Sequence, residues 1–513
     1  MLVRRLVPVL AAGLAASALA VLTPAVAVAA PQSRPPSQAA SPSGLAWQRC
    51  GADTPADFEC TTVKVPLDYR APGGKKIDVA VSRIRTADPA KRRGVLLFNP
   101  GGPGGPGLGM PPEFRDALPR SVLDRFDLVG FDPRGVGEST PLACGLSDEE
   151  KLWPRPYVPG AFAVDVARAR GTADKCRAEH GADLKHFTTR NTARDMDAIR
   201  AALGEPKLSY VGYSYGTYLG AVYAQLFPQR ADRIVLDSAV DPALAWRETF
   251  RHWGPDAEKA FERWTRWAAG RHAQYGLGAT PRAVSKTFWD LVAQADRTPV
   301  TVGSRKVSGV EIRDEMRPSV YEVRHASELV AMLKEAAAGK PVPDVPADPP
   351  MSDNEASLQF AIVCGDVSWP KDPRTYRKDA LRDGARFPLY GDFASHINPC
   401  AFWDRPAERV TVVDNRVPAL IVQNEWDSQT PLATARGMQR AMKGARMVTV
   451  DEGEGHGVYL FGSACASDVT SEYLATGRLP AKDVTCRAEP GARRAAPVDL
   501  PKVGVLIGAG AAR

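Results

Sequence analysis

Residues 208–220 read LSYVGYSYGTYLG, and this stretch decides the fold. An apolar run at 208–211 leads directly into GYSYG at 212–216, with Ser214 at its centre. A serine nucleophile stands on a sharp turn between a strand and a helix, where its dihedral angles are strained. Glycines two residues before and after it leave the room that side chains would fill. The pattern therefore predicts a strand, a turn with an exposed Ser214 hydroxyl, and a helix.

Similar apolar runs, bounded by turn-forming residues, recur along the chain. They lie at 77–84, 95–99, 126–131, 208–212, 234–236, 419–423 and 447–450. Runs of this length are typical of buried strands in a largely parallel sheet. Helical patterns separate several of them, such as 192–202, which starts at a threonine cap. Together with the serine turn, this alternation predicts an α/β-hydrolase fold with a mostly parallel central sheet flanked by helices.

A long interruption separates the strand at 234–236 from the next strand, near residue 418. The segment between them, roughly 180 residues, is helix-rich and far too long for one crossover connection. We therefore expect an inserted helical cap domain at 241–405, between core parts at 45–240 and 406–490. An aromatic stripe in the early insertion is expected to serve packing: Trp246, Phe250, Trp253, Phe261, Trp264 and Trp267.

Both ends of the chain differ in composition from the middle. Arg4 and Arg5 precede an apolar run to about residue 22, and small residues follow at 25–29, which predicts a signal peptide at 1–30. An uncleaved membrane anchor is the alternative. The Pro-, Ser- and Ala-rich stretch 31–44 reads as a flexible leader or propeptide, and 491–513 as a flexible tail. We expect a secreted, extracellular protein without stable membrane association after signal cleavage.

Cysteine content and charge limit the function classes further. The chain has 8 cysteines, and this even number fits disulfides in an oxidising compartment. Pairing cannot be deduced from sequence; pairing between neighbours is our hypothesis, with Cys465–Cys486 the most plausible bridge. Neither a redox CxxC motif nor a zinc-ligand spacing occurs, so we expect no cofactor and no metal.

The charged residues that give the net charge of +7 are scattered along the chain, which argues against nucleic acid as a partner. The sequence does not indicate the oligomeric state.

A glycine-rich loop follows the strand at 95–99 and reads NPGGPGGPG at 99–107. Glycines allow the backbone to approach a substrate carbonyl oxygen and direct amide hydrogens at it. Prolines stiffen the loop but donate no hydrogen bond. We predict an oxyanion hole formed by the backbone N–H groups of Gly102 and Tyr215.

A base and an orienting acid follow the nucleophile in the chain order serine, acid, histidine in this fold. His456, in EGHG at 454–457, is the histidine that lies beyond the late strands. Asp427 follows the strand at 419–423 and is the predicted acid. Glu425 and Asp237, each at or near the end of a predicted strand, are the alternatives.

With these residues placed, the chain resembles the tripeptidyl and prolyl aminopeptidase group of α/β-hydrolases, particularly the secreted actinobacterial enzymes. The matching segments are NPGGPGGPG at 99–107, FDPRGVGES at 131–139, GYSYGTYLG at 212–220, WDSQTP at 426–431 and GHG at 455–457. The resemblance covers about residues 45–490, and Ser214, Asp427 and His456 match the family's triad positions.

The resemblance implies release of short peptides, typically tripeptides, from polypeptides with free N-termini. Acidic cap groups would then hold the substrate's α-ammonium, and Glu248, Asp256, Glu258 and Glu262 are available in the early insertion. A secreted carboxylesterase using the same triad is the alternative function. A binding protein on an inactive hydrolase scaffold is a third, which the intact triad and glycine loop disfavour.

Overall fold

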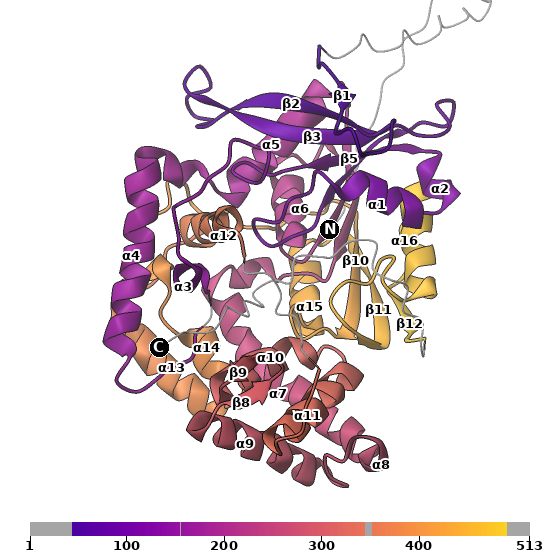
Figure 1. Cartoon of the computed structure of the whole chain (residues 1–513). Coiled ribbons are helices and arrows are strands. Elements are labelled where there is room, and N and C mark those ends of the chain that lie inside the picture. Colours follow the sequence, from indigo (N-terminus) through magenta and orange to yellow (C-terminus); the bar gives the residue numbers. More distant parts are fainter. Residues whose placement is uncertain (1–43, 154, 344–350, 490–513) are drawn as a thin grey trace, which may run out of the picture. The chain divides into compact units, whose positions relative to one another are not determined.

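A computed structural model describes residues 44–153, 155–343 and 351–489 (Figure 1). The predicted signal peptide and the predicted tail lie outside the described residues, as does the predicted leader except for its last residue. No helix within the described ranges is long and apolar enough to cross a membrane.

The central strands form where the apolar runs predict them. β4 (Gly94–Asn99), β5 (Phe126–Phe131) and β6 (Leu208–Tyr213) are buried at every residue. Such continuous burial arises because helices cover both faces of a parallel sheet. Alternate residues of β4 accordingly belong to two separate apolar cores, Leu96 and Phe98 to one and Val95 and Leu97 to the other.

Ten strands of the described residues form one sheet, in the order β1-β2-β3-β5-β4-β6-β7-β10-β11-β12. From β5 to β12 all neighbours are parallel, whereas β1, β2 and β3 pair antiparallel. The remaining bounds are β1 (Gln48–Arg49), β2 (Glu59–Pro66), β3 (Lys76–Ile84), β7 (Ala231–Asp237), β10 (Ala419–Trp426), β11 (Ala445–Glu454) and β12 (Val484–Arg487).

Three strands, the edge strands β1 and β12 and the adjacent β2, were not among the predicted strands. Each is short or partly exposed and carries polar residues, so no apolar run marks it. β10 and β11 also extend further toward their carboxyl ends than the predicted 419–423 and 447–450. Their last residues are half-buried or polar, and only pairing with neighbouring strands defines them.

Helices cover the two faces of the sheet. The two apolar cores show which helices lie on which face. Met110 and Phe114 of α1 belong to the same core as Leu96, whereas Ala221 and Val222 of α6 belong to the other core. In Figure 1, α1, α2 and α16 lie on one side and α5 and α6 on the other. The bounds are α1 (Met110–Ala117), α2 (Arg120–Leu123), α3 (Asp148–Lys151), α4 (Phe162–His180), α5 (Thr189–Ala202), α6 (Tyr215–Leu226), α15 (Leu432–Ala441) and α16 (Ala464–Thr476).

Helix α5 starts three residues before the predicted 192. Its cap is Thr188, whose hydroxyl accepts a hydrogen bond from the Asn191 N–H at 3.3 Å. Thr188, Thr189 and Thr192 are all possible caps by residue type. The N–H and hydroxyl of Thr189 are bonded to Asp366, a residue distant in sequence, and this contact favours Thr188 as the cap.

Between β7 and β10 the chain forms the helical insertion. Its elements are α7 (Arg247–Ala269), α8 (His272–Tyr275), α9 (Pro281–Arg297), β8 (Val300–Val302), β9 (Arg305–Val307), α10 (Gly309–Ser319), α11 (Val323–Ala337), α12 (Asp353–Asp366), α13 (Pro373–Arg386) and α14 (Gly391–Ser395). β8 and β9 form a small hairpin that was not predicted. The aromatic stripe is buried except for Trp267, which is partly buried against the same core. The exact insertion boundaries, 241 and 405, stay a prediction.

All eight cysteines form disulfides, and each pairs with its neighbour along the chain. The bridges are Cys50–Cys60, Cys144–Cys176, Cys364–Cys400 and Cys465–Cys486. The hypothesis of neighbour pairing, including Cys465–Cys486, is therefore confirmed.

Candidate active site

Ser214 stands on the turn between β6 and α6 with φ of 55° and ψ of −122°. This left-handed conformation is strained for a residue with a Cβ atom. Two backbone contacts hold it: the Ser214 N–H donates to the Asp237 carbonyl at 3.0 Å, and the Thr217 hydroxyl donates to the Ser214 carbonyl at 2.6 Å. The strand, turn and helix predicted from GYSYG are present.

The glycines of this motif are sterically required. A Cβ atom on Gly212 would lie 2.5 Å from the Gly216 carbonyl oxygen. A Cβ atom on Gly216 would lie 2.7 Å from the Asn99 Oδ1 atom, at the start of the glycine-rich loop. The serine turn therefore lies directly against Asn99, with no space for a side chain at Gly212 or Gly216.

Sheet register brings the glycine-rich loop next to Ser214. Asn99, the last residue of β4, is the direct partner of Gly212 in β6. Gly101 has φ of 102°, and a Cβ atom on it would lie 3.0 Å from the Ser214 Cβ atom and 3.3 Å from the Tyr215 nitrogen. Gly102 follows with φ of 108°. Tyr215 is the first residue of α6, where a backbone N–H has no partner within the helix.

Asp132 supports the far end of the same loop. Its carboxylate accepts the N–H groups of Gly107 and Leu108, each at 2.9 Å, and of Glu138 at 3.0 Å. Burial raises the pKa of Asp132, against the opposing effect of these bonds. The FDPRGVGES turn thus braces the loop.

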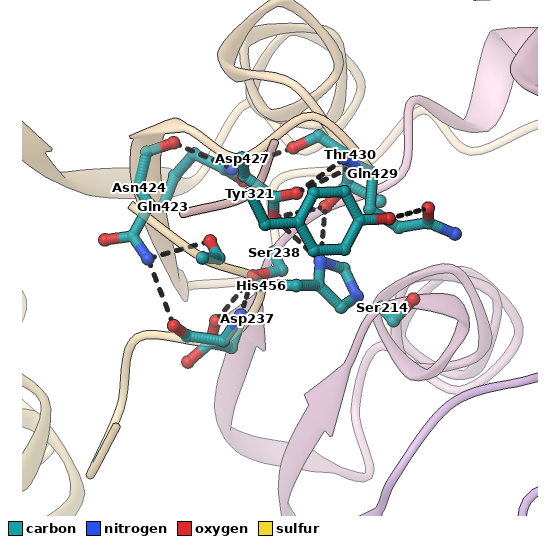
Figure 2. Close-up of polar contacts among 12 residues, drawn as sticks. Ser214, Asp237, Ser238, Tyr321, Gln423, Asn424, Asp427, Gln429, Thr430 and His456 are labelled. Atoms are coloured by element: carbon teal, nitrogen blue, oxygen red, sulfur yellow. Dashed lines mark hydrogen bonds and ion pairs between the residues drawn. The ribbon is translucent and has the colours of Figure 1, made fainter. Parts of the chain in front are cut away.

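His456 follows β11 and is bonded to Asp427, which follows β10. The His456 Nδ1 atom lies 2.8 Å from Asp427 Oδ2. Among the described residues, the buried Nε2 atom has no hydrogen-bond partner. Figure 2 shows the imidazole ring between Asp427 and Ser214, with the ring directed toward the serine.

Asp427 is held as an acceptor from several sides. Its Oδ1 atom accepts the N–H groups of Gln429 at 2.8 Å and Thr430 at 3.0 Å, and its Oδ2 atom accepts the Thr430 hydroxyl at 2.9 Å. Burial alone would raise the pKa of Asp427, but the charge and hydrogen bond of His456 and the bonds from Thr430 outweigh it and lower the pKa. The site therefore keeps this carboxylate ionised.

The two alternative acids bind backbone groups instead of the imidazole. Glu425 accepts the Glu452 N–H at 2.9 Å. The fully buried Asp237 accepts the N–H groups of Val458 and Tyr459. Burial raises the pKa of Asp237 to about 7, while those bonds act in the opposite direction.

The insertion contacts residues next to Asp427 and His456. Trp253 of α7 donates its indole N–H to the Gln429 carbonyl at 3.1 Å, and the Tyr321 hydroxyl donates to the Gln429 side chain (Figure 2). Arg263 of α7 forms an ion pair with Glu454 at 3.0 Å. Ser214 as a whole residue is 4% exposed, and the exposure of its hydroxyl oxygen stays a prediction.

The four acidic candidates of the early insertion all lie on α7: Glu248, Asp256, Glu258 and Glu262. The first and last are exposed and pair with arginines of the same helix. Asp256 accepts a bond from Lys259 at 3.0 Å, and Glu258 accepts the Leu389 N–H at 2.7 Å. Each already has a partner within the protein, so an amine-binding role for any of them stays a prediction.

Three polar residues around the triad escaped the sequence analysis: Thr430, Asn424 and Ser238. Thr430 was detectable, because a hydroxyl three residues after an aspartate is well placed to bond its carboxylate locally. Asn424 and Ser238 bond backbone groups far away in the sequence, so no local signal indicates them.

Comparison with known proteins agrees with this geometry. The family model described as "alpha/beta hydrolase fold" matches residues 94–298, and the one described as "TAP-like protein" matches residues 387–486. The chain is 37% identical to the tripeptidyl aminopeptidase of Streptomyces lividans over 87% of each chain. It is 30% identical to the serine protease Hip1 of Mycobacterium tuberculosis, over 86% of this chain and 90% of the relative. It is also 30% identical to carboxylesterase B of that organism, over 90% and 92% of the two chains.

Proposed function

The chain belongs to the tripeptidyl aminopeptidase family of α/β-hydrolases, and we propose that it is a secreted serine exopeptidase that releases short peptides, in particular tripeptides, from free N-termini. The observation that supports the serine-hydrolase mechanism most is the 2.8 Å bond between His456 Nδ1 and Asp427. It leaves the buried Nε2 atom, on the side of Ser214, without a partner in the part of the chain that the structure describes (Figure 2). An imidazole held in this tautomer is ready to accept the serine proton.

Acylation is the first half of the proposed reaction. The Ser214 oxygen attacks the scissile carbonyl carbon while His456 Nε2 takes the hydroxyl proton, and Asp427 stabilises the resulting imidazolium. The N–H groups of Gly102 and Tyr215 receive the negative charge that develops on the carbonyl oxygen. The C–N bond then breaks, and His456 gives its proton to the departing amine.

Deacylation reverses these roles with water. His456 takes a proton from the water molecule, whose oxygen attacks the acyl carbon, and the proton returns to Ser214 as the ester bond breaks. The released acid is the short N-terminal peptide.

Export is part of the proposal. The charged and apolar start of the sequence, the small residues after it and the four disulfides all fit an oxidising extracellular compartment.

Substrate preference tests the exopeptidase assignment. The purified protein is given Ala-Ala-Pro with a chromogenic leaving group, once with a free and once with a blocked amine, and a chromogenic butyrate ester. We expect rapid cleavage of the free peptide and little of the blocked one. Equal rates on both peptides would reject an exopeptidase while retaining a serine hydrolase.

A carboxylesterase is the second candidate, because carboxylesterase B is among the relatives and the same triad hydrolyses esters. Cleavage of the butyrate ester with neither peptide cleaved would establish it.

A further inference from the structure

The turn that carries His456 is held by side chains outside the triad. Within the described residues, the imidazole itself is bonded to Asp427 and lies 3.4 Å from the Thr430 hydroxyl. Its position relative to Ser214 therefore depends on the backbone of residues 454–459. Figure 2 shows Asn424, Asp237 and Ser238 around this backbone.

Asn424 holds the carbonyl side of the turn. Its Nδ2 atom lies within hydrogen-bond distance of three carbonyl oxygens: Glu454 at 2.9 Å, Gly455 at 3.0 Å and Gly457 at 3.1 Å. These carbonyls come from residues on both sides of His456. The two amide hydrogens are thus shared among three acceptors of one short segment.

Asp237 and Ser238 hold the N–H side. The Asp237 carboxylate accepts the N–H groups of Val458 at 3.1 Å and Tyr459 at 2.6 Å. The Ser238 hydroxyl accepts the Gly457 N–H at 2.8 Å and donates to Asp237 Oδ1 at 3.0 Å. Three successive N–H groups after His456 are thereby fixed.

Asp237 also reaches the nucleophile. Its backbone carbonyl accepts the Ser214 N–H at 3.0 Å, while its carboxylate binds the turn of His456. One residue at the end of β7 therefore connects the backbone of the nucleophile with the backbone of the base. Val422 pairs with Asp237 in the sheet, so Asn424 lies two residues further along the adjacent strand.

Ser238 has a side chain at a position where glycine would carry less backbone strain. Its φ is 58°, a left-handed conformation that glycine adopts without steric cost. A serine in this place is explained by its hydroxyl, which bridges Asp237 and Gly457.

We propose that Asp237, Ser238 and Asn424 act as positioning residues, a clamp that sets His456 Nε2 against the Ser214 hydroxyl from both sides of the turn. The proposal rests on the function proposed above. A displacement of about 1 Å between reacting groups is enough to lower a rate 100-fold, so the clamp acts on turnover more than on substrate binding.

Ser238→Gly is the most direct test, because it removes the hydroxyl and relieves the left-handed strain together. We expect kcat on the free Ala-Ala-Pro substrate to fall on the order of 10- to 100-fold, with KM changed less than about threefold. The midpoint of thermal unfolding should stay near that of the wild type. Asp237→Asn replaces the carboxylate that accepts the Val458 and Tyr459 N–H groups with an amide. It should lower kcat more than Ser238→Gly does.

Asp353→Asn is the matched control. Asp353 also accepts two successive N–H groups, those of Gly145 and Leu146 at 2.8 and 2.9 Å, in a segment that carries no site residue. We expect its kcat to equal that of the wild type. Asn424→Asp, which removes the amide donor to the carbonyl oxygens of the turn, should lower kcat as well, and Asp353→Asn is its control too.

The outcomes separate the clamp from the proposed function. If the wild type neither cleaves the peptide nor reacts with a fluorophosphonate at Ser214, the proposed function fails. If the wild type does both and Ser238→Gly keeps its kcat within about twofold, the clamp is overturned. An equal loss in Asp353→Asn would overturn it as well. Should Asp237→Asn not fold, Ser238→Gly alone decides.

Discussion

At the scale of single residues, Ser214 shows how a costly conformation is maintained. A strained backbone of this kind costs on the order of 1–3 kcal/mol and persists only when its surroundings determine it. Here the N–H of Ser214 is bonded to Asp237 and its carbonyl to Thr217, so relaxation of the turn would break both. The hydroxyl is thereby left to face the imidazole (Figure 2).

Ser214→Ala should lower turnover by about four or more orders of magnitude, because no other group can form the acyl-enzyme. The midpoint of thermal unfolding should change little. Ser209→Ala is the control, since Ser209 is a buried serine on β6, the strand that leads to Ser214, and should retain full turnover. Peptide cleavage and fluorophosphonate labelling measure both variants, and near-normal turnover in Ser214→Ala would refute the nucleophile.

At the scale of elements, neighbouring strand ends assemble the site. The ends of β4 and β6 bring the glycine loop to the serine turn, and β7, β10 and β11 end beside them with Asp237, Asp427 and His456. Parallel strands all end at the same edge of a sheet, so their following loops converge there. Contacts between these loops, and not within any one of them, therefore define the geometry.

Gly216→Ala tests this convergence. The new Cβ atom would lie 2.7 Å from Asn99 Oδ1 and would push the serine turn away from the glycine loop. We expect turnover to fall about 100-fold or more, with loss of stability. Gly171→Ala is the control, because nothing lies within 4 Å of its Cβ position on α4. It should raise the free energy of unfolding by up to about 1 kcal/mol and leave turnover unchanged.

Asp366, at the end of α12, gives a prediction about pH. It accepts the N–H and hydroxyl of Thr189 at 2.8 and 2.6 Å and the Trp246 indole N–H at 3.0 Å. Thr189 in turn contacts the Tyr215 hydroxyl at 2.9 Å. Burial raises the pKa of Asp366 from 3.8 to about 6, so the folded state binds this proton more tightly than the unfolded state. The resulting stability is complete below pH 3.8 and is lost as the pH rises through about 6.

Asp366→Asn removes that titration. Between pH 4.5 and 7.5, the free energy of unfolding of the wild type should fall by about 2 kcal/mol relative to the variant. Urea unfolding of both proteins at several pH values measures the difference. A difference that is constant with pH would contradict the raised pKa.

At the scale of the whole molecule, the insertion and the core are tied together around the site. Gln429 receives bonds from Trp253, Arg317 and Tyr321 of the insertion, and its own N–H donates to Asp427, the predicted acid. The insertion therefore supports the segment that holds Asp427. Cys364 of the Cys364–Cys400 disulfide lies on α12, two residues before Asp366, which is bonded to Thr189 of α5.

Removal of this disulfide by Cys364→Ala with Cys400→Ala should lower the free energy of unfolding by about 4 kcal/mol, because it releases a loop of 36 residues in the unfolded chain. Removal of Cys50–Cys60, with a separation of 10, should lower it by about 3 kcal/mol. Denaturant unfolding of the two variants measures both. A larger loss from the shorter loop would contradict the loop-closure explanation.

The sequence by itself determined the features that depend on local pattern. Apolar runs, turn glycines and the order of Ser214, Asp427 and His456 predicted the fold class and the candidate triad. Each motif spans only a few residues, and the fold class fixes the order in which the three residues follow one another. The neighbour pairing of the cysteines was one hypothesis among the many pairings that the sequence leaves open.

Only the tertiary structure decided the contacts between distant segments. It brought His456 to Asp427 while Asp237 and Glu425 bind backbone N–H groups, it placed insertion side chains on Gln429, and it joined Asn424 and Ser238 to the turn of His456. Each of these depends on strand register and helix packing, where hydrogen bonds join residues up to 222 positions apart. No local pattern encodes such a partner, because the same side chain could satisfy its hydrogen bonds in many other places until the sheet fixes its position.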